Sequence, residues 1–443
     1  MRLVRERVDV LGAGVSGLAT AWFLSQQRPE LEIHVWEKDS TPGGLAGSFT
    51  TESYRVEKFY HHLFRRDVAL QNLITELGLG ADLVWRPAST GAYYFARPYR
   101  LSSPLDLLRF DPLPVVDRIR LGLLVLAARR VRDWRTLDDV PVRDWIVRHA
   151  GSRVYEVVWE PLLHGKFGPN ADSVSAAWLW SKLVDRGGSR DASGHELLGY
   201  LRGGLGRVFE TITEQLRAAG HSVHLGEPVV ALESRGDRIT QVVTAGGSHP
   251  AGFVVSGLQL PDLVPLLPSS ADTLRRSASA IGFLGNVCLV LELERPLSDF
   301  YWTNVTDRDA PFVGIVEQTN WADRTDFAGR SLAYVSAYLP SGDTRWGMDA
   351  EELHAFYLPH IRRLFPAYDP TLVRRKLVWH ASSAQPIVST GYRRLVPPIE
   401  TEIENLFICT MAQIYPNDRQ VSNGVEMARR TAEAVMRRAR IAS

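Results

Sequence analysis

The chain has 443 residues, of which 45% are hydrophobic and 23% are charged. These fractions are ordinary for a folded protein and exclude a disordered, collagen-like or coiled-coil chain. At roughly 150 residues per domain, the length predicts two or three folded units. The 51 basic and 50 acidic residues give a net charge of +1, so we expect no nucleic-acid partner.

Cys288 and Cys409 are the only cysteines. They are too few for a disulfide scaffold or a four-thiolate zinc site, so we predict no metal. We see no signal peptide, and the apolar stretch at Leu121–Ala128 is far shorter than the ~20 residues that cross a bilayer. Together with the scarce cysteines, this favours a cytoplasmic protein.

The N-terminal segment has the pattern of a dinucleotide-binding unit. A strand at Val8–Leu11 runs into a glycine turn, which is followed by a helix and by a second strand that ends at Glu37. The turn has the form G-x-G-x-x-G and comprises Gly12, Ala13, Gly14, Val15, Ser16 and Gly17. Its first glycine permits the turn, its second admits a pyrophosphate, and its third lets the helix sit against the strand.

Two further features of this segment indicate which kind of dinucleotide binds. The first residues of the helix, Val15 and Ser16, offer free N–H groups to the phosphates. Glu37 lies 20 residues after Gly17, where an acid binds ribose hydroxyls and disfavours the 2′-phosphate of NADP. We therefore predict a dinucleotide site without a 2′-phosphate.

A second glycine turn follows the acid directly and indicates a flavin. Lys38 comes after Glu37, and the turn contains Gly43, Gly44, Leu45 and Ala46. On these residues the chain resembles the flavin amine oxidase superfamily, which includes protoporphyrinogen oxidases, carotenoid desaturases and UDP-galactopyranose mutases. The resemblance implies FAD as cofactor, with both glycine turns close to it.

The resemblance extends over most of the chain. Further matching stretches are Leu163–Gly168, Pro311–Asn320 and Tyr415–Arg419. It implies that the backbone at Val229 contacts the adenine. It also implies that a C-terminal helix begins near the flavin ring, with Met411, Asp418 and Val421 among the cofactor contacts.

The implied fold class is α/β, with a Rossmann-type FAD-binding domain and a discontinuous second α+β substrate domain. We place the FAD-binding domain at residues 1–85, 200–256 and 396–443, and the substrate domain at residues 86–199 and 257–395. Alternating runs such as Val287–Leu293 and Leu332–Tyr338 predict a sheet with helices on it in the second domain.

Five polar residues are candidates for catalysis. His61 and His62 can exchange protons near neutral pH, and neighbours on a strand point to opposite faces, so only one of them should face the flavin. Lys166 is either a substrate-binding or a surface lysine. Gln318 and Asn320 follow the end of an expected strand and could form a substrate-facing edge.

Two classes of reaction remain open, together with a flavin-bound protein that has no turnover. No second strand–glycine–helix pattern offers a nicotinamide domain. In the first class a small organic substrate passes hydride to flavin N5, and molecular oxygen or another acceptor reoxidises the flavin. The second class is a redox-neutral isomerase of a nucleotide sugar, for which Arg97, Tyr99, Arg100 and Lys166 could bind the pyrophosphate.

One segment is strongly basic. Residues 118–135 contain six arginines and a single acid, Asp133, around the apolar stretch Leu121–Ala128. Such a helix has either a solvated face or a peripheral contact with an anionic membrane. No pattern predicts the oligomeric state.

Overall fold

The computed structural model describes residues 6–94, 97–186 and 196–442. Segments far apart in the sequence build a parallel five-stranded sheet in the order β10-β2-β1-β14-β20. Its strands are β1 (Arg7–Leu11), β2 (Glu32–Glu37), β10 (Ser222–Leu225), β14 (Phe253–Ser256) and β20 (Leu406–Ile408). The strands predicted in this unit are thus confirmed to within two residues at each end.

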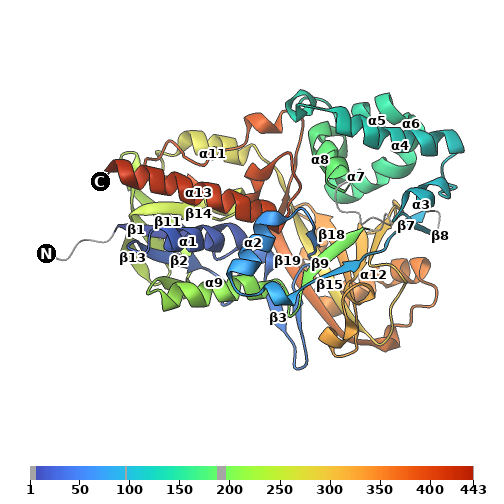
Figure 1. The fold of residues 1–443 in the computed structure, drawn as a ribbon, viewed down its shortest axis with the longest axis horizontal. Helices are drawn as coiled ribbons and strands as arrows, with labels where there is room; N and C mark the ends of the chain where they lie inside the picture. Colours follow the sequence, from blue (N-terminus) through green and yellow to red (C-terminus); the bar gives the residue numbers. More distant parts are fainter. Residues whose placement is uncertain (1–5, 95–96, 187–195, 443) are drawn as a thin grey trace.

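Alternation along these strands decides what covers each face of the sheet. Val8, Val10, Ile33 and Val35 join one buried cluster with the helices α1 (Val15–Gln27), α9 (Gly206–Ala218) and α13 (Val421–Ala442), and α2 (Val68–Glu76) packs on α13. Leu11 and Trp36 join another cluster with the antiparallel strands β11 (Val229–Arg235) and β12 (Arg238–Thr244), beside β13 (Gly247–Pro250). Figure 1 shows this layered unit at the left.

An aromatic stack joins the two layers at the end of β2. The Trp36 ring lies 4.0 Å from the His224 ring, nearly parallel to it, and 4.6 Å from the His249 ring. The Trp36 Nε1–H donates to Asp9 Oδ1 at 3.0 Å. These residues come from β2, β10, β13 and β1, so the stack ties the three-stranded layer to the sheet.

The second unit is built on a seven-stranded sheet in the order β19-β15-β18-β17-β16-β7-β8, parallel only between β16 and β7. Its strands are β7 (Thr90–Tyr94), β8 (Arg97–Arg100), β15 (Phe283–Leu293), β16 (Trp302–Val305), β17 (Gly314–Glu317), β18 (Ser331–Leu339) and β19 (Val373–Pro386). Helix α12 (Ala350–Leu364) covers one face. This confirms the predicted sheet with helices.

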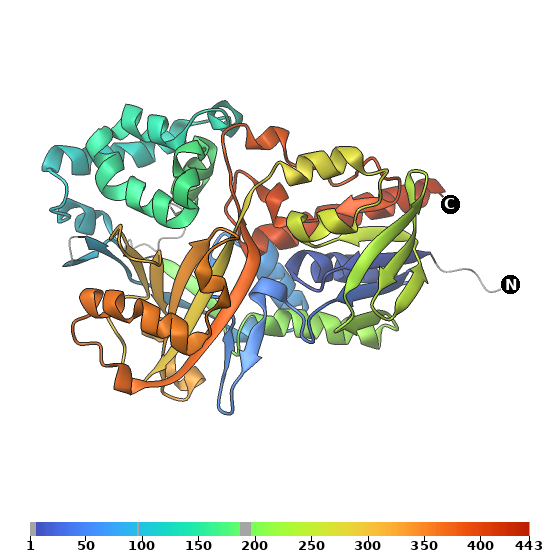
Figure 2. The ribbon, with the colours of Figure 1, turned by 180° about the vertical axis from the view of Figure 1, so that it is seen from behind.

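A helical bundle packs beside that sheet, as Figure 2 shows. It comprises α3 (Pro104–Leu108), α4 (Val115–Arg130), α5 (Val142–Ala150), α6 (Ser152–Val154), α7 (Glu160–Phe167) and α8 (Ala176–Arg186). The remaining helices are α10 (Leu260–Leu263) and α11 (Asp272–Ser279). None of the helices in the described residues combines the length and the apolar content needed to span a bilayer.

Short strands connect the two units. They are β3 (Ser48–Thr50), β4 (Arg55–Glu57), β5 (Leu63–Phe64), β6 (Leu83–Pro87) and β9 (Leu197–Leu201). The pair β3–β4 leads the chain out of the second glycine turn toward the seven-stranded sheet, where Tyr334 donates its hydroxyl to the Glu57 carbonyl at 3.0 Å. The fold class is as predicted, while the domain boundaries stay a prediction.

Candidate active site

The two glycine turns lie against each other at the start of α1. The Gly43 N–H donates to the Ala13 carbonyl at 2.8 Å, and Gly14 pairs with Gly43 in an isolated bridge. Gly12 and Gly43 adopt φ values of +92° and +107°, which favour glycine. A Cβ on Gly14 would meet no atom within 4 Å, whereas one on Gly17 would lie 2.0 Å from the Gly12 carbonyl oxygen.

The space above Gly14 fits an anionic group. Helix α1 begins at Val15 with no side-chain cap and no acid in its first turn, so its N–H groups and positive dipole end are available to phosphate. Ser16 is buried in that turn. The second glycine turn, Gly44–Ala46 with Leu45 between, closes the other side, because a Cβ on Gly44 would stand 3.4 Å from Gly14 Cα. The predicted phosphate-binding residues therefore line one cradle.

Glu37 has a second role that the sequence did not reveal. Its Oε2 accepts the Ala13 N–H at 2.6 Å and its Oε1 accepts the Asp39 N–H at 2.9 Å, so the acid also holds the glycine turn in place. Burial raises the pKa of Glu37, and the two N–H groups oppose that rise. Lys38 beside it is exposed.

The predicted adenine contact lies on the same edge of the sheet. The Glu227 N–H donates to the Glu37 carbonyl at 2.7 Å, and the Gly226 N–H donates to the Asp39 carbonyl at 2.9 Å. Val229 begins β11 two residues later. A ribose and adenine attached to the phosphate cradle would follow this edge, so the residues present fit FAD.

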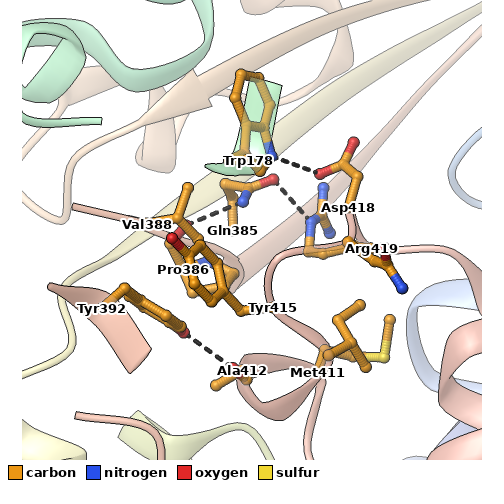
Figure 3. Close-up of a pocket in the computed structure, with 12 residues that line it drawn as sticks. Trp178, Gln385, Pro386, Val388, Tyr392, Met411, Ala412, Tyr415, Asp418 and Arg419 are labelled. Carbon is orange, nitrogen blue, oxygen red and sulfur yellow. Dashed lines mark hydrogen bonds between the residues drawn. The ribbon is translucent and has the colours of Figure 1, made fainter. Parts of the chain in front are cut away.

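A charged cluster lies just before α13, which begins at Val421. Figure 3 shows three of its residues, Trp178, Asp418 and Arg419. Asp418 accepts hydrogen bonds from Lys166 Nζ at 3.2 and 3.3 Å, from Trp178 Nε1 at 3.3 Å, and from Lys182 Nζ. Burial by itself would raise the pKa of Asp418, but the charges of Lys166, Lys182 and Arg419 hold it well below its usual range. Burial lowers the pKa of Lys166, and Asp418 counteracts that effect.

Arg419 links this cluster to the seven-stranded sheet. Its Nε donates to Gln385 Oε1 at 2.9 Å and its Nη2 donates to the Tyr338 hydroxyl at 3.0 Å. The start of α13 also packs on the start of α1, since a Cβ on Gly424 would lie 2.9 Å from Val15 Cγ1 and 3.2 Å from Met411 Sδ. Met411 and the first turn of α13, which begins at Val421, thus lie at the start of α1, while Asp418 lies three residues before that turn.

Sequence reasoning missed most of this cluster. Trp178, Lys182, Tyr338 and Gln385 received no role. Trp178 and Lys182 lie four residues apart on α8 and so share one face, which was the only local signal. Tyr338 and Gln385 come from β18 and β19, and no pattern in the sequence connects them to Asp418.

His61 and His62 make different contacts, but not because they alternate along a strand, as predicted. They lie in a loop between β4 and β5 rather than on a strand, so the argument from strand alternation was wrong. His61 Nδ1 is 2.8 Å from the Phe59 carbonyl, which can only accept, so Nδ1 carries the proton and Nε2 is an acceptor. Burial, together with the charge of Arg419, lowers the pKa of His61 to about 4.

The His62 side chain contacts a different set of residues from that of His61. Its Nδ1 lies 3.0 Å from the Tyr301 hydroxyl, and its ring packs edge-on against Trp302. Gln318 and Asn320 also lie elsewhere. Gln318 is buried and the Asn320 amide donates to the carbonyls of Ser298 and Phe300.

The distance of Gln318 and Asn320 from the cluster follows from the strand register. The preceding residue, Glu317, pairs with Ala333, and Tyr338 is five residues further along β18, or roughly 17 Å. The structure therefore does not bring Gln318 and Asn320 to the cluster. Of the five catalytic candidates, Lys166 is part of the cluster, and His61 is near Arg419, whose charge adds to burial in lowering the pKa of His61.

A cleft of about 380 Å³ leads toward the cluster. Glu160, His164 and Gly165 of α7 form one wall, and Tyr338 lies on the other. An ion pair between Glu160 and Arg308 spans the cleft. Tyr338, which also bonds Arg419, is the residue that this cleft shares with the charged cluster. Among the described residues, no group of three or more His, Cys, Asp or Glu side chains could hold a metal ion.

Known proteins share the sequence pattern or the fold of this chain. A family model described as flavin containing amine oxidoreductase matches residues 15–436. Coproporphyrinogen III oxidase of Staphylococcus aureus is 26% identical over 183 residues, which are 38% of this chain and 38% of that protein. The match thus spans under half of that relative's own length.

Two solved structures share the fold over nearly the whole chain. A protein from an Exiguobacterium species, named there as a candidate protoporphyrinogen oxidase, superposes with a TM-score of 0.78 at 17% identity, covering 97% of this chain and 98% of its own. A reduced UDP-galactopyranose mutase superposes with a TM-score of 0.75 at 14% identity, covering 98% and 94%. At such identities the superpositions show the fold alone.

The predicted superfamily, fold class and FAD cofactor are therefore confirmed. The glycine cradle, the acid at the end of β2 and the start of α13 stay the predicted places for that cofactor. The chain belongs to the flavin containing amine oxidoreductase family.

Proposed function

We propose that this protein oxidises a small organic substrate by removing hydride from a C–H bond next to nitrogen or next to an unsaturated centre. Bound FAD would supply the hydride acceptor at its N5 atom. The observation that supports the proposal is a half-buried His61 whose Nδ1 bonds the Phe59 carbonyl and leaves Nε2 as an acceptor. Burial and the nearby charge of Arg419 lower its pKa, and Asp418 and Lys166 are paired beside Arg419. The Staphylococcus relative, named for oxidation of a porphyrinogen, supports the same class of reaction.

The residues of the chain have separable tasks in this proposal. His61 Nε2 accepts the proton that leaves the substrate with the hydride. Lys166 and Arg419 orient polar groups of the substrate, and Asp418 keeps both cations in position. Trp178 and Tyr338, which flank Lys166 at 5.0 and 5.6 Å, exclude water from the reacting bond.

The electron acceptor and the location are part of the same proposal. The described residues contain a single parallel sheet of the nucleotide-binding type, which favours molecular oxygen or another diffusible acceptor over a bound nicotinamide. Both cysteines are free and buried, which suits the reducing cytoplasm that we propose as the location.

The test begins with the absorption spectrum of the purified protein before and after acid precipitation. We expect flavin bands that move to the supernatant, since no cysteine or histidine needs to bond the cofactor. Coproporphyrinogen III and a set of amines are then added without oxygen. Bleaching of the flavin by one of them, followed by peroxide release on aeration, is the expected result. A colourless protein that FAD does not reconstitute would contradict the proposal.

A redox-neutral isomerase is the second candidate. Three cations, Lys166, Lys182 and Arg419, surround the one carboxylate of Asp418, and an excess of positive charge suits a nucleotide-sugar pyrophosphate. Of the other residues considered for this role, Arg97, Tyr99 and Arg100 lie on β8 at the edge of the sheet. Conversion of UDP-galactopyranose only after the flavin is reduced, with no peroxide formed, would establish this alternative.

A further inference from the structure

One face of the seven-stranded sheet packs on α12, and the other face has a row of small side chains. Cys288 on β15 pairs with Ser336 on β18, and Ser336 pairs with Gly314 on β17, so the three residues lie side by side on one face. The next positions on that face hold Tyr334 on β18 and Trp302 on β16. Large aromatic side chains thus border the small row, which forms a low floor beside them.

Asn286 reaches this row and has an amide oxygen without a partner. It lies two residues before Cys288 on the same face of β15 and is only 5% exposed. Its Nδ2 donates to Ser336 Oγ at 2.9 Å, which brings the amide group to the small row. Within the described part of the chain, Asn286 Oδ1 is buried and meets no hydrogen-bond donor. Such an oxygen is rare in a folded protein, because it has lost water without gaining a donor.

The neighbours of Asn286 determine which end of its amide is unpaired. Burial raises the pKa of Tyr60, and the Ser336 hydroxyl opposes that rise, as a hydroxyl that donates to the phenol oxygen does. Because Ser336 gives its proton to Tyr60, its oxygen accepts from Asn286, and only the Nδ2 end of the amide can donate. The group that Asn286 lacks is therefore a hydrogen-bond donor.

This part of the sheet adjoins the candidate active site. Asn286 lies directly opposite Tyr338 in the strand register, so their Cβ atoms are about 5 Å apart. The Tyr338 hydroxyl accepts from Arg419 at 3.0 Å. Tyr60, which contacts the small row, directly precedes His61 in the sequence. The unpaired oxygen therefore lies close to residues that we assign to the reaction.

We propose that Asn286 selects the substrate by accepting a hydrogen bond from a substrate N–H group that rests against the row of small side chains. Of the two kinds of C–H bond in the proposed oxidation, only the one next to nitrogen brings such a donor. A hydrocarbon would instead leave the Asn286 oxygen buried and unpaired, which a site of this kind rejects. The substrate class is an amine or nitrogen heterocycle that keeps at least one N–H. The choice of bond rests on the proposed function, whereas the hydrogen bond to Asn286 does not.

Two ligands that differ in a single N–H test the role of Asn286 in the FAD-loaded full chain. Indole donates one N–H and N-methylindole donates none, so titration calorimetry should show at least ~10-fold tighter binding of indole by the natural chain. N286L, which replaces the amide with an apolar side chain of similar size, should bind both ligands with equal affinity. Equal affinities in the natural chain, or a preference for indole that N286L keeps, would overturn the proposal.

Asn304 provides a matched control, because both ends of its amide are paired. Trp302 donates to its Oδ1 at 3.0 Å, and its Nδ2 donates to the Gly91 carbonyl at 3.3 Å. N304L should therefore melt at a lower temperature than the natural chain, whereas N286L should not, since it removes an unpaired oxygen. An N286L protein that melts as low as N304L would assign Asn286 a structural role instead.

Flavin reduction separates this role of Asn286 from the proposed oxidation itself. Benzylamine and N,N-dimethylbenzylamine are compared as anaerobic reductants of the flavin in the natural chain and in N286L. We expect benzylamine to be the faster reductant of the natural chain, and N286L to slow it at least ~10-fold. Bleaching by benzylamine at equal rates in both proteins would contradict the selection by Asn286. If neither amine nor coproporphyrinogen III bleaches the flavin, the proposed oxidation fails, while the indole pair still decides the role of Asn286.

Discussion

Gly14 and Gly17 belong to one motif, but their surroundings differ. Open space surrounds Gly14, whose φ of −79° and ψ of −173° any residue can adopt, whereas Gly17 touches the Gly12 carbonyl. We predict that G14A changes the free energy of unfolding of the apoprotein by no more than about 0.5 kcal/mol relative to the natural chain. The same variant should weaken FAD binding at least ~10-fold. G17A should lose about 2 kcal/mol of stability, because the new methyl group pushes α1 away from β1.

Urea unfolding of the apoproteins and FAD titration by fluorescence measure both effects. The two variants, G14A and G17A, control for each other, since each adds one methyl group at the start of α1. Tight FAD binding by G14A would show that the space above Gly14 is not the phosphate cradle.

His61 and His62 offer a second matched pair. If His61 Nε2 is the proton acceptor, H61Q should lower kcat about 100-fold, whereas H62Q should change it little, because His62 lies beside Tyr301. Since burial holds the pKa of His61 at about 4, the imidazole is already neutral at pH 5. The kcat/KM profile should therefore be level from pH 5 to 8 and fall only in more acidic solution.

The measurement is the pH profile of the natural enzyme and both variants with whichever substrate bleaches the flavin. An ionisation near pH 6.5 that H61Q abolishes would mean that the site does not depress the pKa of His61. Equal losses in H61Q and H62Q would point to a structural role for the loop as a whole.

At the scale of secondary structure, the stack of Trp36 with His224 and His249 predicts how pH changes the stability of the five-stranded sheet and the three-stranded layer that the stack joins. Burial lowers the pKa of His224, and neighbouring His34, His249 and Arg7 add to that effect while Glu227 opposes it. The folded state therefore resists a proton that the unfolded state accepts near pH 6.5. By linkage, stability should fall as the pH drops below about 6.5.

Thermal unfolding at pH 5 and pH 7 tests this prediction. H224F keeps an aromatic ring against Trp36 without the ionisable nitrogen, so the gap between its two melting temperatures should be smaller than that of the natural chain. An unchanged gap would assign the pH effect to other groups, among which buried His61 acts in the same direction.

The elements also show what sequence patterns can establish. Val8–Leu11 and the glycine turn were predictable because every requirement is local: a short buried strand, a positive φ at Gly12 and a helix start at Val15. The segment around His61 and His62 was not, because its aromatic residues resemble a strand but pair with none. Its position depends on the Phe59 carbonyl and on Tyr301, which lies hundreds of residues away.

The candidate site likewise has one half that a local sequence pattern predicts and one half that only the fold brings together. Its cofactor half consists of glycine turns and an acid at fixed spacing, and the sequence contains that spacing. Its substrate half joins Lys166, Asp418, Tyr338 and Gln385 from four separate elements, so only the fold can assemble it. Gln318 and Asn320 were chosen for polarity at a strand end, and the register of β17 on β18 placed them at the other end of the sheet.

For the whole molecule, removal of the cofactor should lower the free energy of unfolding. The residues that would hold FAD come from the first 46 residues, from the 226–229 edge and from the start of α13. Binding to the folded state alone adds about 2.7 kcal/mol when free FAD is 100 times its Kd. We predict that apoprotein melts at a lower temperature and that added FAD restores the loss in a concentration-dependent way.

Differential scanning calorimetry with increasing FAD measures this linkage. Adenosine diphosphate, which lacks the flavin ring, is a useful comparison because it should restore only part of the loss. A melting temperature that does not depend on FAD would contradict the proposed cradle, and G14A should show a smaller response than the natural chain.

The order of strands in the five-stranded sheet has a consequence for synthesis. β1 and β2 leave the ribosome early, whereas β20 and α13 are made after residue 405. Asp418 lies just before α13, and the first turn of α13 packs on Val15, so the nascent chain would have a phosphate cradle long before it has a place for the ring. The complete site then waits for α13 to be made, and a product that stops before β20 leaves the edge of β14 unpaired, where chaperones and proteases can bind.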